Sequence, residues 1–199
     1  MARILLSVPS FDYSVDSRVD EALGNLDRCG HEIVQRNIGG WDVARARNLM
    51  AHAALDENCD YLFMVDSDTV PPRDALTHLM SHNLDVCLGW YPRGTDPSMT
   101  NMIVPCTLGY TESFPVSELE RLADNGVELL EVKAGGLGCA LIKTSVFRRF
   151  KAPWFLFVNH GDGRWLGEDN YFCQQVAQSG SRIYADARVR CGHVKDTVL

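Results

Sequence analysis

The sequence has no long apolar run, no recognisable signal peptide and no paired cysteine motif. No segment approaches the roughly 20 consecutive apolar residues of a membrane-spanning helix. The N-terminal apolar stretch is too short, and carries too little positive charge, for a secretion signal. The seven cysteines include no Cys-x-x-Cys pair, which favours buried, reduced thiols over a zinc or iron–sulfur site. We therefore expect a cytoplasmic protein without a membrane span.

The sequence also lacks an excess of positive charge and the common phosphate-binding motifs. Its 26 acidic and 19 basic residues give a net charge of −7, so nucleic-acid binding is not expected. An anionic substrate would need a bound metal ion or local arginines, because the overall field repels it. No dinucleotide-binding fingerprint, phosphate loop, nucleophile elbow or deaminase zinc motif is present. These absences remove several of the commonest enzyme classes.

The first 91 residues alternate apolar strands with helices of ordinary length. At 199 residues, 46% hydrophobic and 23% charged, the chain is most simply a single domain over 1–199. The alternation predicts an α/β fold with a mostly parallel, Rossmann-like sheet flanked by helices. Strands are predicted at 3–8, 32–36, 61–65 and 85–90, and helices from about 15 to Gly30, at 43–57 and from Pro72 to about His82.

The remainder of the chain has a more mixed pattern. Four prolines fall within 92–116, and Ser117 to Glu120 has the form of a capping box at a helix start. We interpret 1–91 as a nucleotide-binding half and 92–199 as a mixed, acceptor-side half. Strands are predicted at 102–108, 127–133 and 138–143, helices at 117–126, 145–150 and 168–179, a loop at 159–167, and one or two closing strands at 182–194.

Two aspartates separated by one residue follow the apolar run at 61–65. If the segment stays extended, Asp66 and Asp68 point to the same side, because alternate residues of a strand share a face. Paired carboxylates at the carboxyl end of a strand suit a hard divalent cation such as Mg²⁺ or Mn²⁺. Ligands also bind at this edge of open α/β sheets. The alternative is a structural turn whose carboxylates cap the following helix.

Three further features carry groups that would complete such a site. Arg47 lies on a predicted helix, where its guanidinium could contact a base or diphosphate, or simply face solvent. Glu168 and Asp169 open a later helix, whose dipole favours acids whatever their function; one of them could also be the general base for an incoming hydroxyl. His193, beside a glycine at the end of a closing strand, is a candidate third metal ligand or phosphate contact.

Together and in this order, the motifs resemble the GT-A class of nucleotide-sugar-dependent glycosyltransferases, in a form similar to family 2. The resemblance implies a hexosyltransferase that uses Mn²⁺ or Mg²⁺ and a nucleoside-diphosphate sugar, with UDP favoured over GDP by class frequency. The acceptor, a hydroxyl on a sugar, a small molecule or a macromolecule, stays open. The matching segments are Ser7–Pro9, Ala46–Asn48, Val65–Asp68, Gly135–Ile142, Gly167–Asp169 and Gly192–His193.

The resemblance also implies roles for individual residues. It implies a metal site formed by Asp66, Asp68 and His193. The nucleotide pocket would include Pro9, Arg47 and Asp66, and Gly138 would border the donor sugar. Asp169, with Glu168 beside it, would face the acceptor. Arg93 could join Arg47 in stabilising charge on the leaving diphosphate. The loop around Trp165 could form a lid over a sugar, or the aromatic ring could simply be packed.

Three other interpretations compete with this one. In a haloacid-dehalogenase-like phosphatase Asp66 would be the nucleophile and Asp68 the acid/base, with Gly161–Asp162 followed by Glu168–Asp169 as the late acidic motif. Two strand–helix units precede the motif here, however, and Pro71–Pro72 fits poorly with that family's flap. A sugar-phosphate nucleotidyltransferase would need a glycine-rich basic loop after the first strand, where Pro9–Tyr13 has no glycine. The third is a nucleotide- or carbohydrate-binding module without turnover.

Overall fold

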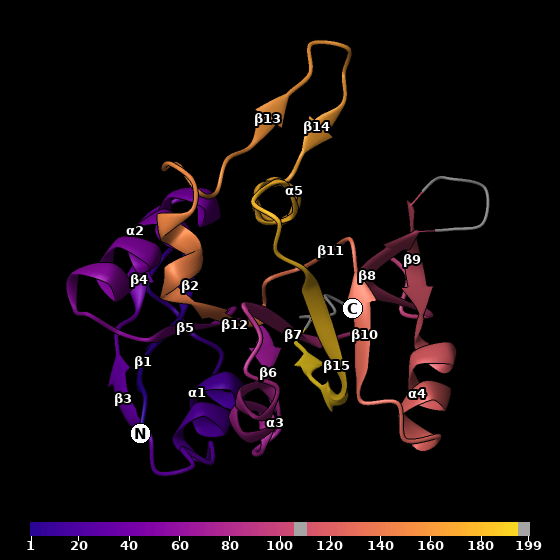
Figure 1. Cartoon of the computed structure of the whole chain (residues 1–199), viewed down its shortest axis with the longest axis horizontal. Helices are drawn as coiled ribbons and strands as arrows, with labels where there is room; N and C mark the ends of the chain where they lie inside the picture. The colour runs from indigo at the N-terminus through magenta and orange to yellow at the C-terminus, as the bar shows by residue number, and fades with distance from the viewer. Residues whose placement is uncertain (106–110, 195–199) are drawn as a thin grey trace.

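A seven-stranded sheet forms the centre of the computed structural model, which describes residues 1–105 and 111–194 (Figure 1). The strands are β1 (Arg3–Ser7), β3 (Glu32–Gln35), β5 (Tyr61–Val65), β7 (Val86–Trp90), β10 (Leu129–Val132), β12 (Cys139–Lys143) and β15 (Ile183–Arg190). Their order in the sheet is β10–β15–β7–β12–β5–β1–β3. Strands from both halves of the chain are therefore interleaved in one sheet.

Helices and shorter strands surround this sheet. The helices are α1 (Ser17–Gly24), α2 (Val43–Asp56), α3 (Ala75–Ser81), α4 (Val116–Asp124) and α5 (Glu168–Gln178), with a 3₁₀ helix η1 (Thr144–Arg148). The shorter strands are β2 (Pro9–Ser10), β4 (Ile38–Gly39), β6 (Thr69–Val70), β8 (Met99–Pro105), β9 (Thr111–Pro115), β11 (Ala134–Gly135), β13 (Val158–Asn159), β14 (Trp165–Leu166) and β16 (Gly192–His193). β11, β8 and β9 form a second sheet, and β13 with β14 forms a hairpin that projects from the body (Figure 1).

Strand direction brings several loops to one edge of the sheet. β1 is parallel to β3 and β5, and β15 is parallel to β7. β12 is antiparallel to both β5 and β7, so β5 and β7 point the same way. β10 is also reversed, so five of the seven strands share one direction. The predicted α/β fold with a mostly parallel sheet is confirmed, and the segments after β1, β5, β7 and β15 leave the sheet at the same edge.

The central strands are apolar on both faces because helices cover both sides of the sheet. In β5, Leu62 and Met64 belong to the core cluster that includes Met50 of α2. Phe63 and Val65 belong to the opposite cluster, which is completed by α1 and α3. All of these residues are fully buried. A strand covered on both faces is a continuous apolar run in the sequence. The bounds of β5 could therefore be predicted correctly from the apolar run at 61–65.

The structure departs from the predicted elements in three places. Residues 159–167, predicted as a loop, include the second residue of β13 and all of β14, because the two short strands pair. Helix α1 ends at Gly24, before the predicted stop at Gly30. Helix α4 is capped by Pro115, so the capping box predicted at Ser117 does not form. The two helix departures are at element ends, where boundaries are least well defined by local sequence, whereas the hairpin depends on the pairing of two short strands.

Two further predictions concern membrane spans and cysteines. Over residues 1–105 and 111–194, no helix is long and apolar enough to cross a membrane. Six cysteines lie in these ranges and all are free thiols; Cys29 is exposed and the other five are buried. The seventh, Cys106, lies outside the described residues, as does the end of the strand predicted at 102–108.

Two glycines next to β12 let the backbone approach a buried tyrosine. A Cβ atom at Gly136 would lie 2.5 Å from the Tyr91 hydroxyl, and one at Gly138 would lie 2.8 Å from it. Burial, reinforced by the charge of Asp66, raises the pKa of Tyr91 well above its ordinary value, so the hydroxyl stays protonated. Glycine is thus required here by packing against Tyr91.

Replacing Gly136 with alanine should destabilise the fold, because the new methyl group would overlap the Tyr91 hydroxyl. We expect urea titration to show a loss of about 1–3 kcal/mol in the free energy of unfolding. In a Tyr91→Phe background the nearest remaining atoms lie at 3.3 and 3.4 Å, so the same substitution should cost much less. Gly24→Ala, whose Cβ would meet nothing within 4 Å, should be neutral or slightly stabilising. An equal cost of Gly136→Ala in both backgrounds would contradict this account.

Candidate active site

A buried arginine joins three segments at the carboxyl edge of the sheet. Arg47 on α2 is 3% exposed, and its Nη2 donates to both carboxylate oxygens of Asp66, at 2.8 and 2.9 Å. Its Nη1 donates to the carboxylate of Glu168, at the start of α5. A guanidinium this deeply buried needs such partners, because an unpaired charge is costly to remove from water. The contacts therefore fix α2, the segment after β5 and α5 relative to one another.

The two carboxylates keep Arg47 charged inside the protein. Burial alone would lower the pKa of Arg47, but Asp66 and Glu168 outweigh burial, and the pKa is raised above its ordinary value. Burial raises the pKa of Glu168, although Arg47 opposes that shift. With both carboxylates ionised, one arginine faces two acids. The group then carries a net negative charge, which favours a cation nearby.

The segment between β5 and β6 is a turn, closed by a 3.0 Å hydrogen bond from the Thr69 amide to the Asp66 carbonyl. The prediction that Asp66 and Asp68 share a strand face is therefore wrong, because the alternation of side chains ends with the strand. The turn instead directs Asp66 to Arg47 and Asp68 to His193.

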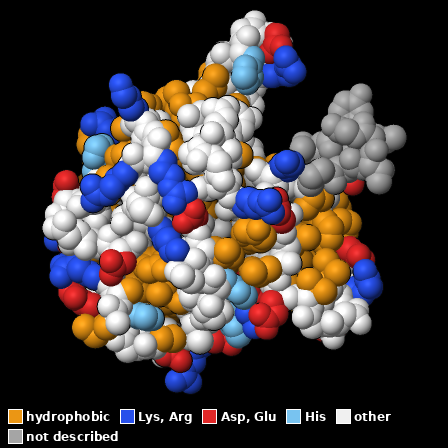
Figure 2. Space-filling model, viewed as in Figure 1, with side chains coloured by type: hydrophobic (Ala, Val, Ile, Leu, Met, Phe, Trp, Pro, Cys, Tyr) orange, Lys and Arg blue, Asp and Glu red, His pale blue; other side chains and the backbone are white. Residues whose placement is uncertain are grey.

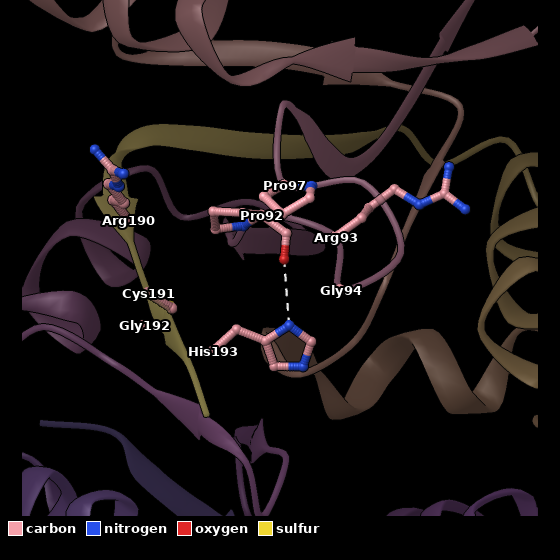
Figure 3. Close-up of a pocket in the computed structure, with 8 residues that line it drawn as sticks. All are labelled: Pro92, Arg93, Gly94, Pro97, Arg190, Cys191, Gly192 and His193. Atoms are coloured by element: carbon pink, nitrogen blue, oxygen red, sulfur yellow. Dashed lines mark hydrogen bonds between the residues drawn. The ribbon is translucent and has the colours of Figure 1, made fainter. Parts of the chain in front are cut away.

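His193 reaches this turn because β16 pairs with β6. Its Nε2 lies 3.2 Å from Oδ2 of Asp68, and its Nδ1 lies 3.2 Å from the carbonyl oxygen of Pro92, the contact drawn in Figure 3. A carbonyl oxygen can only accept, so Nδ1 carries the proton in this contact. Nε2 faces the Asp68 carboxylate, to which a protonated ring donates a hydrogen bond and a neutral ring presents a lone pair. In the neutral form a cation can bridge the ring nitrogen and the carboxylate oxygen.

The Asp68–His193 pair has the donor chemistry of a divalent-cation site. Carboxylate oxygen suits Mg²⁺ and Mn²⁺, imidazole nitrogen is a common metal ligand, and a carbonyl on the opposite ring nitrogen is the usual outer contact of a metal-binding histidine. Both oxygens of Asp66, by contrast, are engaged by Arg47. Within the described ranges no group of three or more acidic, histidine or cysteine side chains could hold a metal. Further ligands would have to come from substrate and water.

A cavity of about 250 Å³ opens beside the two aspartates. It is lined by Pro9, Ser10, Phe11, Trp41, Val43 and Asp66–Asp68. The Ser10 hydroxyl is buried and has no hydrogen-bond partner in the part of the chain that the structure describes. A bound polar ligand would satisfy it. Phe11 and Trp41 are exposed, so the cavity combines aromatic surface with a few polar groups, as small-molecule sites do.

The two acids that open α5 have different surroundings. Glu168 is buried against Arg47. Asp169 is partly exposed, and its Oδ1 accepts a 2.6 Å hydrogen bond from the Asn170 amide. Glu168 therefore holds the arginine in place, whereas Oδ2 of Asp169 is available to a substrate hydroxyl.

The remaining predicted residues lie in different places. Pro9 lines the cavity beside Asp66. The Gly138 carbonyl accepts a 2.9 Å hydrogen bond from the Asp66 amide, so Gly138 supports the turn. Arg93 lies outside this group: it is exposed, its Nη1 donates to the Ser113 hydroxyl at 2.8 Å, and it lines a separate pocket.

Sequence reasoning gave no role to four side chains near this cavity. Ser10 and Phe11 follow β1, Trp41 precedes α2, and Tyr91 follows β7. For Ser10, Phe11 and Tyr91 the available signal was a polar or aromatic side chain soon after a predicted strand, and for Trp41 it was an aromatic residue just before a predicted helix. That signal is weak, because most such residues belong to ordinary loops.

Several solved structures share this fold, although no protein-family model and no curated protein sequence matches the chain. A197 from STIV has a TM-score of 0.66 and 23% identity, covering 98% of this chain and 86% of that one. GalNAc-T7 with UDP, GalNAc and Mn²⁺ has a TM-score of 0.62 and 13% identity, covering 98% and 44%. S. aureus TarS 1–349 in complex with UDP has a TM-score of 0.53 and 15% identity, covering 95% and 59%.

These similarities define the class of fold. The chain is an α/β domain with the architecture of GT-A glycosyltransferases, as the resemblance in its sequence predicted. It spans less than two thirds of the length of the GalNAc-T7 and TarS chains. At these identities the likeness establishes the fold alone.

Arg47→Gln should strongly destabilise the protein, because it leaves two carboxylates in a poorly solvated site without their cation. We expect a loss of about 3–5 kcal/mol in the free energy of unfolding, measured by urea titration at neutral pH. Arg45→Gln is the matched control on the same helix. Arg45 is exposed and stacks 3.3 Å from the Trp41 ring centroid, so its loss should cost no more than about 1 kcal/mol. Similar losses at both positions would contradict the assignment.

Proposed function

We propose that this chain is a metal-dependent glycosyltransferase, of hexosyltransferase type, that moves a sugar from a nucleoside-diphosphate sugar to a hydroxyl acceptor. The observation that carries the proposal is the Asp68–His193 pair beside a cavity at the carboxyl edge of a GT-A fold, with Asp66 fixed next to it by Arg47. UDP is favoured over GDP as the donor nucleotide, because the GalNAc-T7 and TarS structures contain UDP.

Asp68 and His193 would hold the divalent cation, and Mn²⁺ in the GalNAc-T7 structure supports this choice of metal. When bound there, the cation would stabilise the charge that develops on the leaving diphosphate. The cavity lined by Pro9, Ser10 and Trp41 would receive the nucleoside, with Ser10 supplying an unsatisfied hydroxyl.

Arg47 acts as a positioning residue in this proposal. Its Nη1 and Nη2 contact Glu168 and Asp66, so its role is to fix the turn that carries Asp68. Gly138, whose carbonyl holds the Asp66 amide, supports the same turn and would border the donor sugar. Residues 1–91 then form the nucleotide-binding half of a single domain over 1–199, and 92–199 form the acceptor-side half.

Asp169 would act as the general base at Oδ2, taking the proton of the acceptor hydroxyl as the sugar is transferred. Its neighbour Glu168 is committed to Arg47 and would hold the start of α5 in place. The two acids are given different roles because Glu168 is buried, whereas Asp169 is partly exposed and accessible to a second substrate.

Asp68→Asn should remove the metal-dependent part of nucleotide binding without unfolding the protein, because the Asp68 side chain is half exposed. In the native protein, UDP with Mn²⁺ at 100 times its dissociation constant should stabilise the fold by about 2.7 kcal/mol, and EDTA should abolish most of this gain. Thermal unfolding of Asp68→Asn and of His193→Ala should show no Mn²⁺-dependent gain. Asp162→Asn, on the exposed hairpin, should behave like the native protein.

Each alternative outcome of this measurement has a definite meaning. A UDP shift that EDTA leaves intact would contradict the metal assignment. A shift with GDP alone would contradict the donor assignment. No shift with either nucleotide, with metal-dependent release of phosphate from a generic phosphoester, would favour the phosphatase interpretation.

Asp169→Asn should leave donor binding intact but lower sugar transfer by at least about 100-fold, because only proton removal from the acceptor is lost. The measurement is UDP release from UDP-sugars with a panel of hydroxyl acceptors, alongside UDP affinity for the same variant. Asp162→Asn should leave both unchanged. If UDP affinity falls together with transfer in Asp169→Asn, then Asp169 belongs to the donor site.

A further inference from the structure

A second pocket, of about 390 Å³, lies on the other side of His193 (Figure 3). One wall is the segment that follows β7, and the other is the end of β15 with β16. The lining residues are Pro92, Arg93, Gly94, Pro97, Arg190, Cys191, Gly192 and His193. The volume is larger than a single phosphate ion requires and falls in the range of small-ligand pockets.

The charged side chains of this pocket are all basic. Arg93 and Arg190 lie on opposite sides of it, with their guanidinium groups directed away from each other (Figure 3). None of the lining residues within the described part of the chain is acidic. Positive charge gathered in one pocket of a chain with net charge −7 favours an anionic ligand there. The protein as a whole repels anions, but the arginines attract them locally.

The guanidinium groups of both arginines are exposed and could contact a ligand. Arg93 is exposed, and its Nη1 donates to the neutral hydroxyl of Ser113 rather than to a carboxylate. Asp96 lies close enough to feel its charge, but that carboxylate accepts hydrogen bonds from Ser98. Arg190 pairs with Glu120 at the surface, where both side chains are substantially exposed. An exposed pair of this kind is weak and can be exchanged for a ligand.

The pocket is separate from the cavity beside the aspartates. The two share no lining residue, although His193, which lines this pocket, contacts Asp68, which lines the cavity. A ligand in this pocket would therefore lie next to the cation site without occupying the nucleotide cavity.

We propose that this pocket binds the phosphate group of a phosphorylated acceptor, an inference that rests on the proposed glycosyltransferase function. Arginine matches phosphate through paired N–H donors, and the exposed side chains of Arg93 and Arg190 would turn inward to hold a phosphate ester between them. The prolines and Cys191 supply apolar wall for the carbon skeleton attached to the phosphate. The acceptor class is thus a sugar phosphate or related phosphate ester rather than a neutral sugar.

Isothermal titration of the native chain, saturated with UDP and Mn²⁺, tests the site with three probes. Glucose 6-phosphate should bind, inorganic phosphate should bind more weakly, and glucose should not bind measurably. Affinity for glucose 6-phosphate should fall as salt is added, because exposed charges are screened. Equal affinity for inorganic phosphate and glucose 6-phosphate would identify a free-phosphate site and overturn the acceptor assignment.

Arg93→Gln and Arg190→Gln should each weaken glucose 6-phosphate binding by at least about tenfold while leaving UDP affinity unchanged. Arg93 is exposed, and its side chain donates to the Ser113 hydroxyl in an exposed hydrogen bond, so its variant should fold normally even if Arg190→Gln does not. Arg182→Gln is the matched control. Like Arg190 it ends in an exposed pair with a glutamate, Glu131, but it does not line the pocket.

The outcomes separate this proposal from the proposed function. Unchanged glucose 6-phosphate binding in Arg93→Gln would overturn the site. Loss of UDP affinity in the same variant, or displacement of glucose 6-phosphate by UDP, would assign the pocket to the donor diphosphate and also overturn it. If UDP never binds the native chain but glucose 6-phosphate binds in an Arg93-dependent way, the phosphate-ester site is supported and the nucleotide-sugar proposal fails.

Discussion

The buried Arg47 cation is the interaction on which the rest of the site depends. It lies on α2, yet its two partners come from the turn after β5 and from the first residue of α5, 19 and 121 positions away in sequence. Each carboxylate offsets part of the cost of burying the guanidinium, and the guanidinium in turn keeps the carboxylates together. Because α5 begins at this contact, the same interaction sets the position of Asp169. A single buried charge thereby fixes the turn after β5 and the start of α5 relative to each other.

Charge is distributed around this edge in a way that the net value of −7 conceals. Asp66, Asp68 and Glu168 gather negative charge where a cation would be bound, and Arg47 balances only part of it. The pocket on the other side of His193 is lined by arginines. A negatively charged turn next to a basic pocket would, if the proposed functions hold, let an acidic protein receive phosphorylated ligands without a basic surface overall. His193 lies at the boundary and contacts the turn through Nε2 and the segment after β7 through Nδ1.

The central strands and the α/β class could be predicted because local pattern and burial agree there. β5 was predicted with its observed bounds, since a strand covered on both faces is apolar throughout. The β13–β14 hairpin could not be predicted, because each strand has two residues and the pairing joins positions on either side of a polar segment. The turn at Asp66–Asp68 was considered only as the alternative to an extended segment, because an alternating pattern of two aspartates is the same on a strand and in a turn. Only the contacts with Arg47 and His193 decide between them.

The sequence by itself determined the order of elements, the residues that could carry chemistry, and the edge of the sheet at which most of them would meet. That much follows from apolar periodicity and from the rule that parallel strands end at a common edge. Tertiary structure decided which of these residues contact one another. It paired Asp68 with His193, committed Glu168 to Arg47 while leaving Asp169 accessible, and moved Arg93 to a separate pocket. These assignments depend on long-range packing and on the burial of charge, and neither quantity is contained in the spacing of residues along the chain.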